Sequence, residues 1–346
     1  MREVVKIINP YDPGLFPEDF EKPDVIQLGS NENPYEPSEE VKRTYIQSLK
    51  FIRLYPKSTY DILKTELSKY LGVERDEISV GCGASELINC VCMALLEELD
   101  KVAIPVPCYT LYAIYAMLRN AQIYYPQFTG YKLKSDFVYD VKPKLTFLCS
   151  PNNPTGNTIK RKVIEEILEN SEYVVLDEAY VEFSSTSNVN LIEEFDNLIV
   201  IRSFSKFFGL AGMRVGYLVA DRKIVEGIEK IRLPFAISYP ALRTAVAALR
   251  SVDYYLNLKE KIVRERERVY EKLRKISGLE PYPSEANFIL VKVTREVDDL
   301  IQKLLNEGII VRDVTGLIGL DGKHFRVTIG KPEENDRLLV LLSKFC

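Results

Sequence analysis

One segment says most about this chain: Ser203-Phe204-Ser205-Lys206-Phe207-Phe208-Gly209-Leu210-Ala211-Gly212-Met213-Arg214. Three phenylalanines surround Lys206, and loss of hydration lowers the pKa of an amine. A neutral lysine amine attacks carbonyl carbons and forms Schiff bases. Hydroxyl groups on Ser203 and Ser205 precede the lysine, and the guanidinium of Arg214 follows it. Hydroxyls and a guanidinium suit a phosphate, so the segment predicts a site for a ligand with both a carbonyl group and a phosphate.

A second segment supplies a carboxylate. Glu172-Tyr173-Val174-Val175-Leu176 reads as a short buried strand that leads into Asp177-Glu178-Ala179-Tyr180. Pyridoxal phosphate carries an aldehyde and a phosphate, and it withdraws electrons while its ring nitrogen is protonated, usually beside an aspartate. Asp177 is the candidate for that partner, so Asp177 and Lys206 are the candidate catalytic residues. A turn acid or a helix cap explains the tetrapeptide about equally well.

A third segment places a rigid turn after a strand. Cys149-Ser150-Pro151-Asn152-Asn153-Pro154-Thr155-Gly156 follows the apolar run 145–148, and its prolines, asparagines and glycine are typical of loops. In an open α/β sheet, ligands bind beyond the carboxyl ends of the strands. This turn, Asp177 and Lys206 are all expected at that edge.

A glycine turn gives a second candidate phosphate site. Ile78-Ser79-Val80 reads as a strand, Gly81-Cys82-Gly83 as a turn, and a helix is expected from about Ala84. The unpaired backbone amides at a helix N-terminus bind anions, so Gly83, Ala84 and Ser85 are candidate phosphate ligands. A tight turn without a ligand explains the glycine pair as well.

Composition limits the class of protein. The chain has 346 residues, 46% of them apolar, which is enough for a large α/β domain and a smaller one. Its net charge of -4 gives no reason to expect a nucleic-acid partner. No apolar stretch reaches the roughly 18 residues of a membrane span, and residues 1–6 lack a signal-peptide core. We therefore expect no membrane partner and a cytoplasmic location.

Histidine and cysteine usage narrows the chemistry. The only histidine is His324, which argues against histidine-ligated metals and against a serine-histidine-aspartate triad. The six cysteines show no paired CxxC spacing, so no metal site is expected. Lysine, carboxylates, tyrosines or a cofactor must carry any reaction.

Strand-like runs alternate with helical patterns along the chain, which favours a mostly parallel sheet. From residue 254 to residue 276 the pattern predicts a long charged helix, after which shorter strands and helices form a separate smaller unit. The expected division is an N-terminal arm with the start of the small domain over 1–34, a large cofactor-binding domain over 35–245, and a small C-terminal domain over 246–346.

Taken together, the motifs resemble those of the fold-type I pyridoxal-phosphate aminotransferases, and within them the class II histidinol-phosphate aminotransferase branch. The resemblance runs from Leu28-Gly29-Ser30-Asn31-Glu32-Asn33-Pro34 through 150–156, 177–180 and 203–216 to Arg326-Val327-Thr328-Ile329-Gly330. It implies a large domain with a mostly parallel sheet flanked by helices, a smaller α/β C-terminal domain, and pyridoxal 5'-phosphate as cofactor. The family commonly has an acidic residue where Ser85 stands, so backbone amides would carry that contact.

The resemblance also implies roles for single residues around the cofactor. Tyr109 matches the aromatic residue that stacks on the cofactor ring, although a core tyrosine is nearly as good an explanation. Asn153 and Tyr180 match the pair that hydrogen-bonds the ring hydroxyl. Tyr55 matches the tyrosine that reaches the cofactor phosphate of the other subunit, which implies a homodimer. An interface or core position explains Tyr55 equally well.

Substrate contacts come from both ends of the chain. Arg326 matches the arginine that binds the substrate anion, and Arg312 resembles a second one, for which an ion pair with Asp313 or another acid is a nearly equal alternative. Tyr11 and Asn33 lie in the N-terminal arm, where the family places residues that cover the substrate.

The resemblance implies transamination of L-histidinol phosphate with 2-oxoglutarate, which in histidine biosynthesis runs from imidazole-acetol phosphate and glutamate. The partners would be small molecules: a phosphorylated amine and the 2-oxoglutarate and glutamate pair. Threonine-phosphate decarboxylase and aromatic amino-acid aminotransferase use the same scaffold and are the alternatives. A non-enzymatic scaffold that binds the cofactor without turnover is a further alternative.

Overall fold

A seven-stranded sheet forms the larger part of the molecule. The computed structural model describes residues 1–17, 25–295 and 299–346. The strand order is β2-β8-β7-β6-β5-β3-β4, and every neighbouring pair is parallel except the two that β8 forms. The strands are β2 (Ile78–Gly81), β3 (Lys101–Ala103), β4 (Gln122–Tyr124), β5 (Leu145–Cys149), β6 (Tyr173–Asp177), β7 (Leu198–Ser203) and β8 (Gly216–Ala220).

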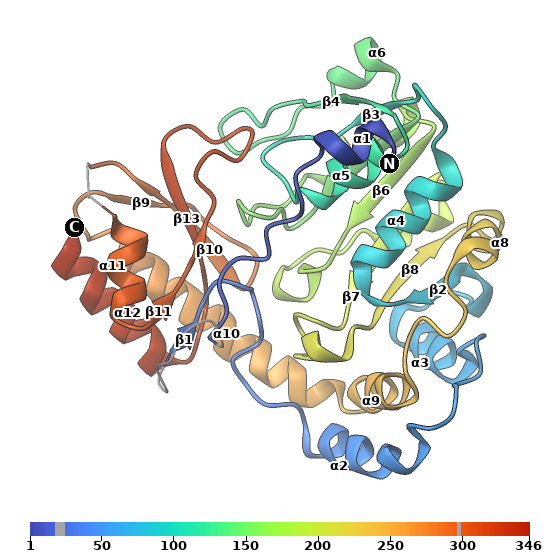
Figure 1. Cartoon of the computed structure of the whole chain (residues 1–346), viewed down its shortest axis with the longest axis horizontal. Helices are drawn as coiled ribbons and strands as arrows, with labels where there is room; N and C mark the ends of the chain where they lie inside the picture. Colours follow the sequence, from blue (N-terminus) through green and yellow to red (C-terminus); the bar gives the residue numbers. More distant parts are fainter. Residues whose placement is uncertain (18–24, 296–298) are drawn as a thin grey trace.

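Helices cover both faces of this sheet (Figure 1). The central strands are therefore buried on both sides and read as continuous apolar runs. Val175 and Ile201 face one core, and Leu176 and Val200 face the other. The helices of this part are α2 (Glu39–Ser48), α3 (Asp61–Leu71), α4 (Gly83–Leu95), α5 (Leu111–Leu118), α6 (Phe137–Val141), α7 (Arg161–Asn170), α8 (Arg222–Ile231) and α9 (Tyr239–Arg250).

A smaller antiparallel sheet lies beside the large one (Figure 1). Its order is β12-β13-β10-β9, and α10 leads to it from the large sheet. These elements are α10 (Val252–Leu273), β9 (Leu279–Pro281), β10 (Phe288–Val293), α11 (Leu300–Asn306), β12 (Arg312–Asp313), β13 (Lys323–Thr328) and α12 (Pro332–Phe345). The predicted α/β fold with a mostly parallel main sheet is confirmed.

The N-terminal segment touches both parts. Helix α1 (Glu3–Ile7) contacts α5 beside the large sheet. Further along, β1 (Ile26–Gln27) lies in the smaller part of the molecule, where it pairs in parallel with β11 (Ile309–Ile310) in a separate two-stranded sheet (Figure 1). No helix in the described part of the chain is long and apolar enough to cross a membrane.

Candidate active site

Lys206 lies in the turn that follows β7. Phe204, Phe207 and Phe208 are fully buried around it, as the sequence indicated. Its Nζ donates a hydrogen bond to the carbonyl oxygen of Ser30 at 2.9 Å. Burial lowers the pKa of the amine to about 8, and the nearby positive charge of Arg326 acts in the same direction. The amine is thus largely neutral at mildly alkaline pH.

Asp177 is the last residue of β6 and is almost completely buried. Its Oδ2 accepts a hydrogen bond from the Tyr112 hydroxyl at 2.6 Å, and its Oδ1 accepts one from the backbone amide of Ala179 at 2.9 Å. Burial raises the pKa of this carboxyl, and the positive charge of Lys206 opposes the rise. Asp177 and Lys206 therefore influence each other's pKa through their charges.

A close approach of two glycines shapes the region around Arg214. Gly83, the first residue of α4, has a φ of +76°, and a Cβ there would lie 2.7 Å from Nη2 of Arg214. A Cβ on Gly216 would lie 2.5 Å from the backbone nitrogen of Ala84. Only residues without side chains allow the guanidinium and the helix N-terminus to come this close. Helix α4 begins one residue before the predicted start.

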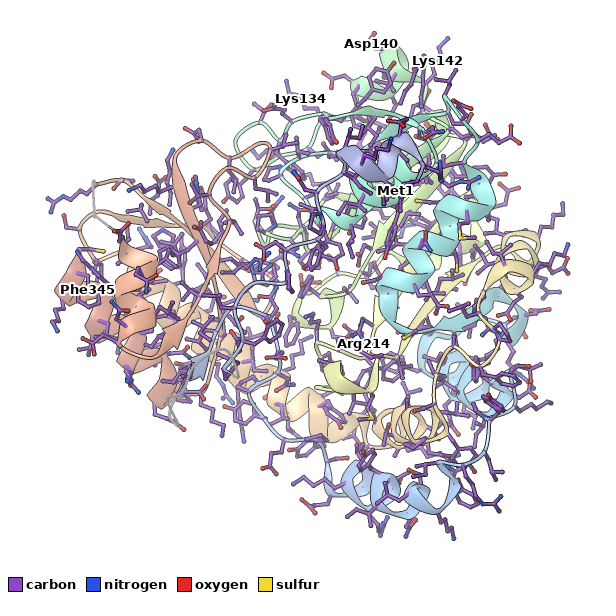
Figure 2. All side chains as sticks on the ribbon, in the orientation of Figure 1. Met1, Lys134, Asp140, Lys142, Arg214 and Phe345 are labelled. Carbon is purple, nitrogen blue, oxygen red and sulfur yellow. The ribbon has the colours of Figure 1, made fainter. Side chains whose placement is uncertain are left out.

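The side chain of Arg214 points toward the predicted serines. Its Nη1 lies 3.4 Å from Oγ of Ser205, and Oγ of Ser203 accepts the backbone amide of Ser205 at 3.1 Å. Figure 2 labels Arg214 near the middle of the view, between the two parts of the molecule, and the residue is exposed in the single chain. The guanidinium, two hydroxyls and the amides of 83–85 thus form one region suited to a phosphate.

Tyr180 and Tyr109 lie close to this region. The hydroxyl of Tyr180 accepts a hydrogen bond from Nδ2 of Asn31 at 3.0 Å. The hydroxyl of Tyr109 lies 3.4 Å from Oγ of Ser85, and its ring meets that of Tyr11 edge-on at 5.7 Å. Tyr109 therefore lies beside Ser85, a predicted phosphate ligand, and close enough to Tyr180 to interact with it electrostatically.

Arg326 is buried and reaches across from β13. Its Nη1 donates to Oδ1 of Asn153 at 2.5 Å and its Nη2 to the carbonyl of Gly29 at 2.7 Å. Its Nε has no hydrogen-bond partner among the described residues. Burial lowers the pKa of this guanidinium. The unpaired donor fits an anionic ligand.

Arg312 faces Arg326 across β12 and β13 in the register. Its Nη2 donates to the carbonyl oxygen of Asp12 at 2.5 Å and lies 3.3 Å from the carboxylate of the same residue. The structure therefore gives Arg312 an acidic partner, Asp12 of the N-terminal segment, which agrees with the alternative of an ion pair with an acid other than Asp313.

Of the remaining candidates, Asn33 contacts the lysine turn, whereas Tyr55 lies on the surface. The amide of Asn33 donates to the carbonyl of Phe207 at 2.9 Å, and its oxygen accepts the backbone amide of Tyr35 at 3.0 Å. Asn33 thus ties the N-terminal segment to the lysine turn. Tyr55 is 78% exposed and stacks on Phe235 at 4.4 Å between ring centroids, so it reaches none of the other candidate residues within this chain.

Two residues near the site were missed by the sequence analysis. Tyr112, in the first turn of α5, donates a hydrogen bond to Asp177, and no local pattern in the sequence indicated a partner 65 residues away. Asn31 binds Tyr180 and adopts a left-handed conformation with a φ of 54°. It lies inside a quoted motif, but nothing local to it indicated a partner 149 residues away. No group of acidic, cysteine or histidine side chains in the described ranges is arranged to hold a metal.

Comparison with known proteins identifies the family. Residues 23–342 match the family described as aminotransferase class I and II. The chain belongs to this family. Among its class I and II relatives is histidinol-phosphate aminotransferase 2 of Archaeoglobus fulgidus, 59% identical over 99% of both chains.

Solved structures of other aminotransferases share the fold. Histidinol-phosphate aminotransferase from Clostridium acetobutylicum superposes with a TM-score of 0.86 at 27% identity, covering 92% of this chain and 98% of that one. The Sinorhizobium meliloti enzyme, solved in complex with pyridoxal-5'-phosphate, gives a TM-score of 0.90 at 23% identity, covering 100% of this chain and 97% of that one.

Proposed function

We propose that this chain is a pyridoxal-phosphate-dependent aminotransferase that exchanges the amino group of L-histidinol phosphate with 2-oxoglutarate. One observation carries the proposal: the amine of Lys206, with a pKa near 8, lies close enough to buried Asp177 and to Arg214 to interact with the charges of both. The Archaeoglobus fulgidus relative, whose name states this activity, supports the substrate.

The residues present fit the cofactor. Gly83 keeps free the space beside Arg214 that a Cβ would fill, so the amides of 83–85, Ser203, Ser205 and Arg214 would hold the phosphate. Asp177 would bind the ring nitrogen, Asn153 and Tyr180 the ring hydroxyl, and Tyr109 the face of the ring. When bound through Lys206, the cofactor supplies an electron sink for charge that develops on the substrate carbon.

Lys206 is the proton carrier of the proposed reaction. A lysine with a pKa near 8 is deprotonated in only a minority of molecules at neutral pH and in most molecules at mildly alkaline pH. Once the substrate amine has replaced it on the cofactor, the free amine of Lys206 would take a proton from the substrate carbon as a general base and then donate it as a general acid. Asp177 keeps its carboxylate toward the reacting centre because Tyr112 and Ala179 hold it there.

Arg326 and Arg312 support a doubly charged substrate anion. Arg312 lies on β12 and Arg326 on the neighbouring strand β13. Nε of Arg326 is a buried donor without a hydrogen-bond partner among the described residues. A forked guanidinium binds phosphate or carboxylate oxygens in pairs. We assign the phosphate of histidinol phosphate and the carboxylate of 2-oxoglutarate to this place, with Tyr11 and Asn33 in the segment that covers it.

We propose a homodimer in which Tyr55 completes the partner's site. Tyr55 belongs to an exposed apolar surface, called here the Tyr55 face, and large exposed apolar patches mark interaction sites. Contact of these apolar side chains with water is unfavourable, and a two-fold contact with a second copy of the chain would bury them. We place the dimer in the cytoplasm, where its small, charged substrates are dissolved. The Tyr55 face comprises Ile46, Leu49, Ile52, Leu54, Tyr55, Leu233 and Phe235.

A half-reaction tests the proposed function. Histidinol phosphate alone, mixed with the purified cofactor-loaded protein, should convert the absorbance of the lysine-bound cofactor to that of pyridoxamine phosphate. The Lys206→Ala variant should show neither the initial absorbance band nor the conversion. A response to phenylalanine with none to histidinol phosphate would contradict the substrate, and released carbon dioxide from threonine phosphate would favour a decarboxylase.

A further inference from the structure

A buried ion pair lies directly behind the active site. Glu178 and Arg202 have side chains that are 0% and 6% exposed. Nε and Nη2 of Arg202 both donate to Oε2 of Glu178, at 3.0 and 2.7 Å. The other carboxylate oxygen accepts the backbone amide of Asn188 at 2.8 Å. Oγ of Ser187 contacts both charged groups, at 3.2 Å from Glu178 and 2.6 Å from Arg202. The carboxylate is therefore fixed from several directions.

The two charged residues are sequence neighbours of the site residues. Glu178 follows Asp177, and Arg202 precedes Ser203, where the site-forming turn of β7 begins. Successive side chains of a strand point to opposite faces. The pair therefore lies on the sheet face opposite Asp177, at the ends of two strands joined in register. The amide of Glu178 also donates to the carbonyl of Ile201 at 2.8 Å.

Stability alone gives little reason to keep such a pair. Removing two charges from water costs several kcal/mol per ion, and apolar residues of similar volume at such positions are often as stable or more stable. A forked guanidinium bound to a carboxylate has a defined distance and direction, which apolar packing does not impose. The pair thus specifies how the end of β6 and the end of β7 lie relative to each other.

Arg202 forms hydrogen bonds with Glu178 but not with Glu182, the other acid near it. The carboxylate of Glu182 also lies near Arg202, yet neither of its buried oxygens has a hydrogen-bond partner among the described residues. Burial raises the pKa of Glu182 to about 7, while the charge of Arg202 opposes that rise. Of the two acids near the guanidinium, only Glu178 is joined to it by hydrogen bonds.

We propose that Glu178 and Arg202 are positioning residues, which hold Asp177 on one strand end and the Ser203–Lys206 turn on the next at the separation that the bound cofactor needs. The proposal rests on the proposed function, because the separation matters through the ring nitrogen and the lysine amine of one cofactor. Neither residue touches the reacting atoms.

The test replaces the pair by apolar residues of similar length. Glu178→Met together with Arg202→Met removes both charges of the pair at once. Glu182 then loses the charge that opposed the rise of its pKa and should bind a proton, so no unpaired buried ion remains to unfold the protein. We expect the double variant to melt near the wild-type temperature. Its cofactor dissociation constant should rise and its kcat should fall by about tenfold to a hundredfold, the effect of a small misplacement of reacting groups. The pH midpoint of the absorbance of the lysine-bound cofactor should also shift.

Two further variants make the result decisive. Arg268→Met removes ion pairs with Glu265 and Asp336 within the smaller part of the molecule, and it should change none of the cofactor readouts. Ser187→Ala removes one hydroxyl at an exposed residue, which contacts both members of the pair and accepts the backbone amide of Val189, so it should fold normally and shift the midpoint in the same direction as the double variant.

The outcomes separate the two proposals. A double variant with wild-type affinity, kcat and midpoint overturns the positioning role. If that variant does not fold, Ser187→Ala decides, and wild-type values for it overturn the role. Failure of the wild-type protein to accept histidinol phosphate would reject the proposed substrate, while cofactor affinity and the midpoint would still report on the pair.

Discussion

Burial acts in opposite directions on the two central groups of the site. It lowers the pKa of Lys206, a cation when protonated, and raises the pKa of Asp177, an anion when deprotonated. Each group then partly reverses the other's shift. The proposed chemistry requires a nucleophilic amine and a carboxyl group as partner of the ring nitrogen, and these two buried groups interact through their charges.

The lysine shift makes a prediction about the cofactor-free protein. Unfolded, the amine binds a proton up to its ordinary pKa of 10.5, but native Lys206 binds it only up to about 8. The unfolded chain therefore holds more protons between these pH values, so native stability rises with pH across that window. Below pH 8 the buried cation lowers the free energy of unfolding by a constant amount.

Lys206→Met should remove this pH dependence. At pH 7 we expect the cofactor-free variant to be more stable than the wild type by roughly 2–3 kcal/mol, with the gap closing toward pH 10.5. Urea unfolding at a series of pH values measures it. A gap of the same size at pH 7 and pH 10 would show that packing, not ionisation, causes the difference.

At the residue scale, the sequence predicted the chemical character of single side chains better than it predicted their hydrogen-bond partners. Desolvation of Lys206 followed from three adjacent phenylalanines, and it holds in the structure. The roles assigned to the site residues remain predictions, although most of those residues lie together. The partners of Asn33 and Arg312 were not predictable, because Phe207 and Asp12 lie far from them in the chain and no local pattern links them.

At the scale of elements, the contact between β8 and the start of α4 sets the shape of the anion site. Gly216 on β8 lies against Gly83 and Ala84 so closely that even a methyl group would collide with backbone atoms. Strand β8 pairs with β2 and β7 in the opposite direction to both, which brings Gly216 opposite Gly81 and Ser203.

Gly216→Ala should therefore displace the N-terminus of α4. We expect the variant to lose stability by about 1–3 kcal/mol, as for other overpacked positions, and to bind pyridoxal phosphate or inorganic phosphate more weakly. Thermal melting and phosphate titration measure the two effects. Gly212→Ala is the matched control, because a Cβ there meets nothing within 4 Å. Equal behaviour of the two variants would contradict the proposed steric role.

The sequence predicted most elements but not their order across the sheet. Period and composition indicated strands, because burial on both faces leaves continuous apolar runs such as 145–148. The insertion of antiparallel β8 between β2 and β7 depends on contacts between distant segments. For the same reason, the close approach of Gly216 to Gly83 was invisible, although both glycines lay inside quoted segments.

At the scale of the whole molecule, the Tyr55 face is the surface that a second copy would cover. Its residues come from two segments, 46–55 and 233–235, which meet where Tyr55 stacks on Phe235. We also propose the division into 1–34, 35–245 and 246–346 as the units of the fold, since the two sheets are built from different parts of the chain.

A charge on the Tyr55 face should separate the subunits. Ile52→Glu introduces a carboxylate at a side chain that is 67% exposed in the single chain, and burying it in an interface would be costly. We expect a monomer by light scattering and at least a tenfold loss of transamination, because a monomer lacks the partner's Tyr55. Val340→Glu, equally exposed on α12, should leave the assembly unchanged. A dimeric, fully active Ile52→Glu protein would contradict this arrangement.

The hydrogen bond from Lys206 to Ser30 has one more consequence. Ser30 belongs to the stretch that follows Leu28, whose carbonyl accepts the amide of Thr328 in the small sheet. The resting amine is therefore one of several hydrogen-bond donors that join this stretch to the large part of the molecule, beside the bonds of Asn31 with Tyr180 and of Asn33 with Phe207. When a carbonyl compound takes the amine, this one bond is exchanged for a bond to the ligand and the other two remain, so occupancy of the site should loosen the stretch without releasing it.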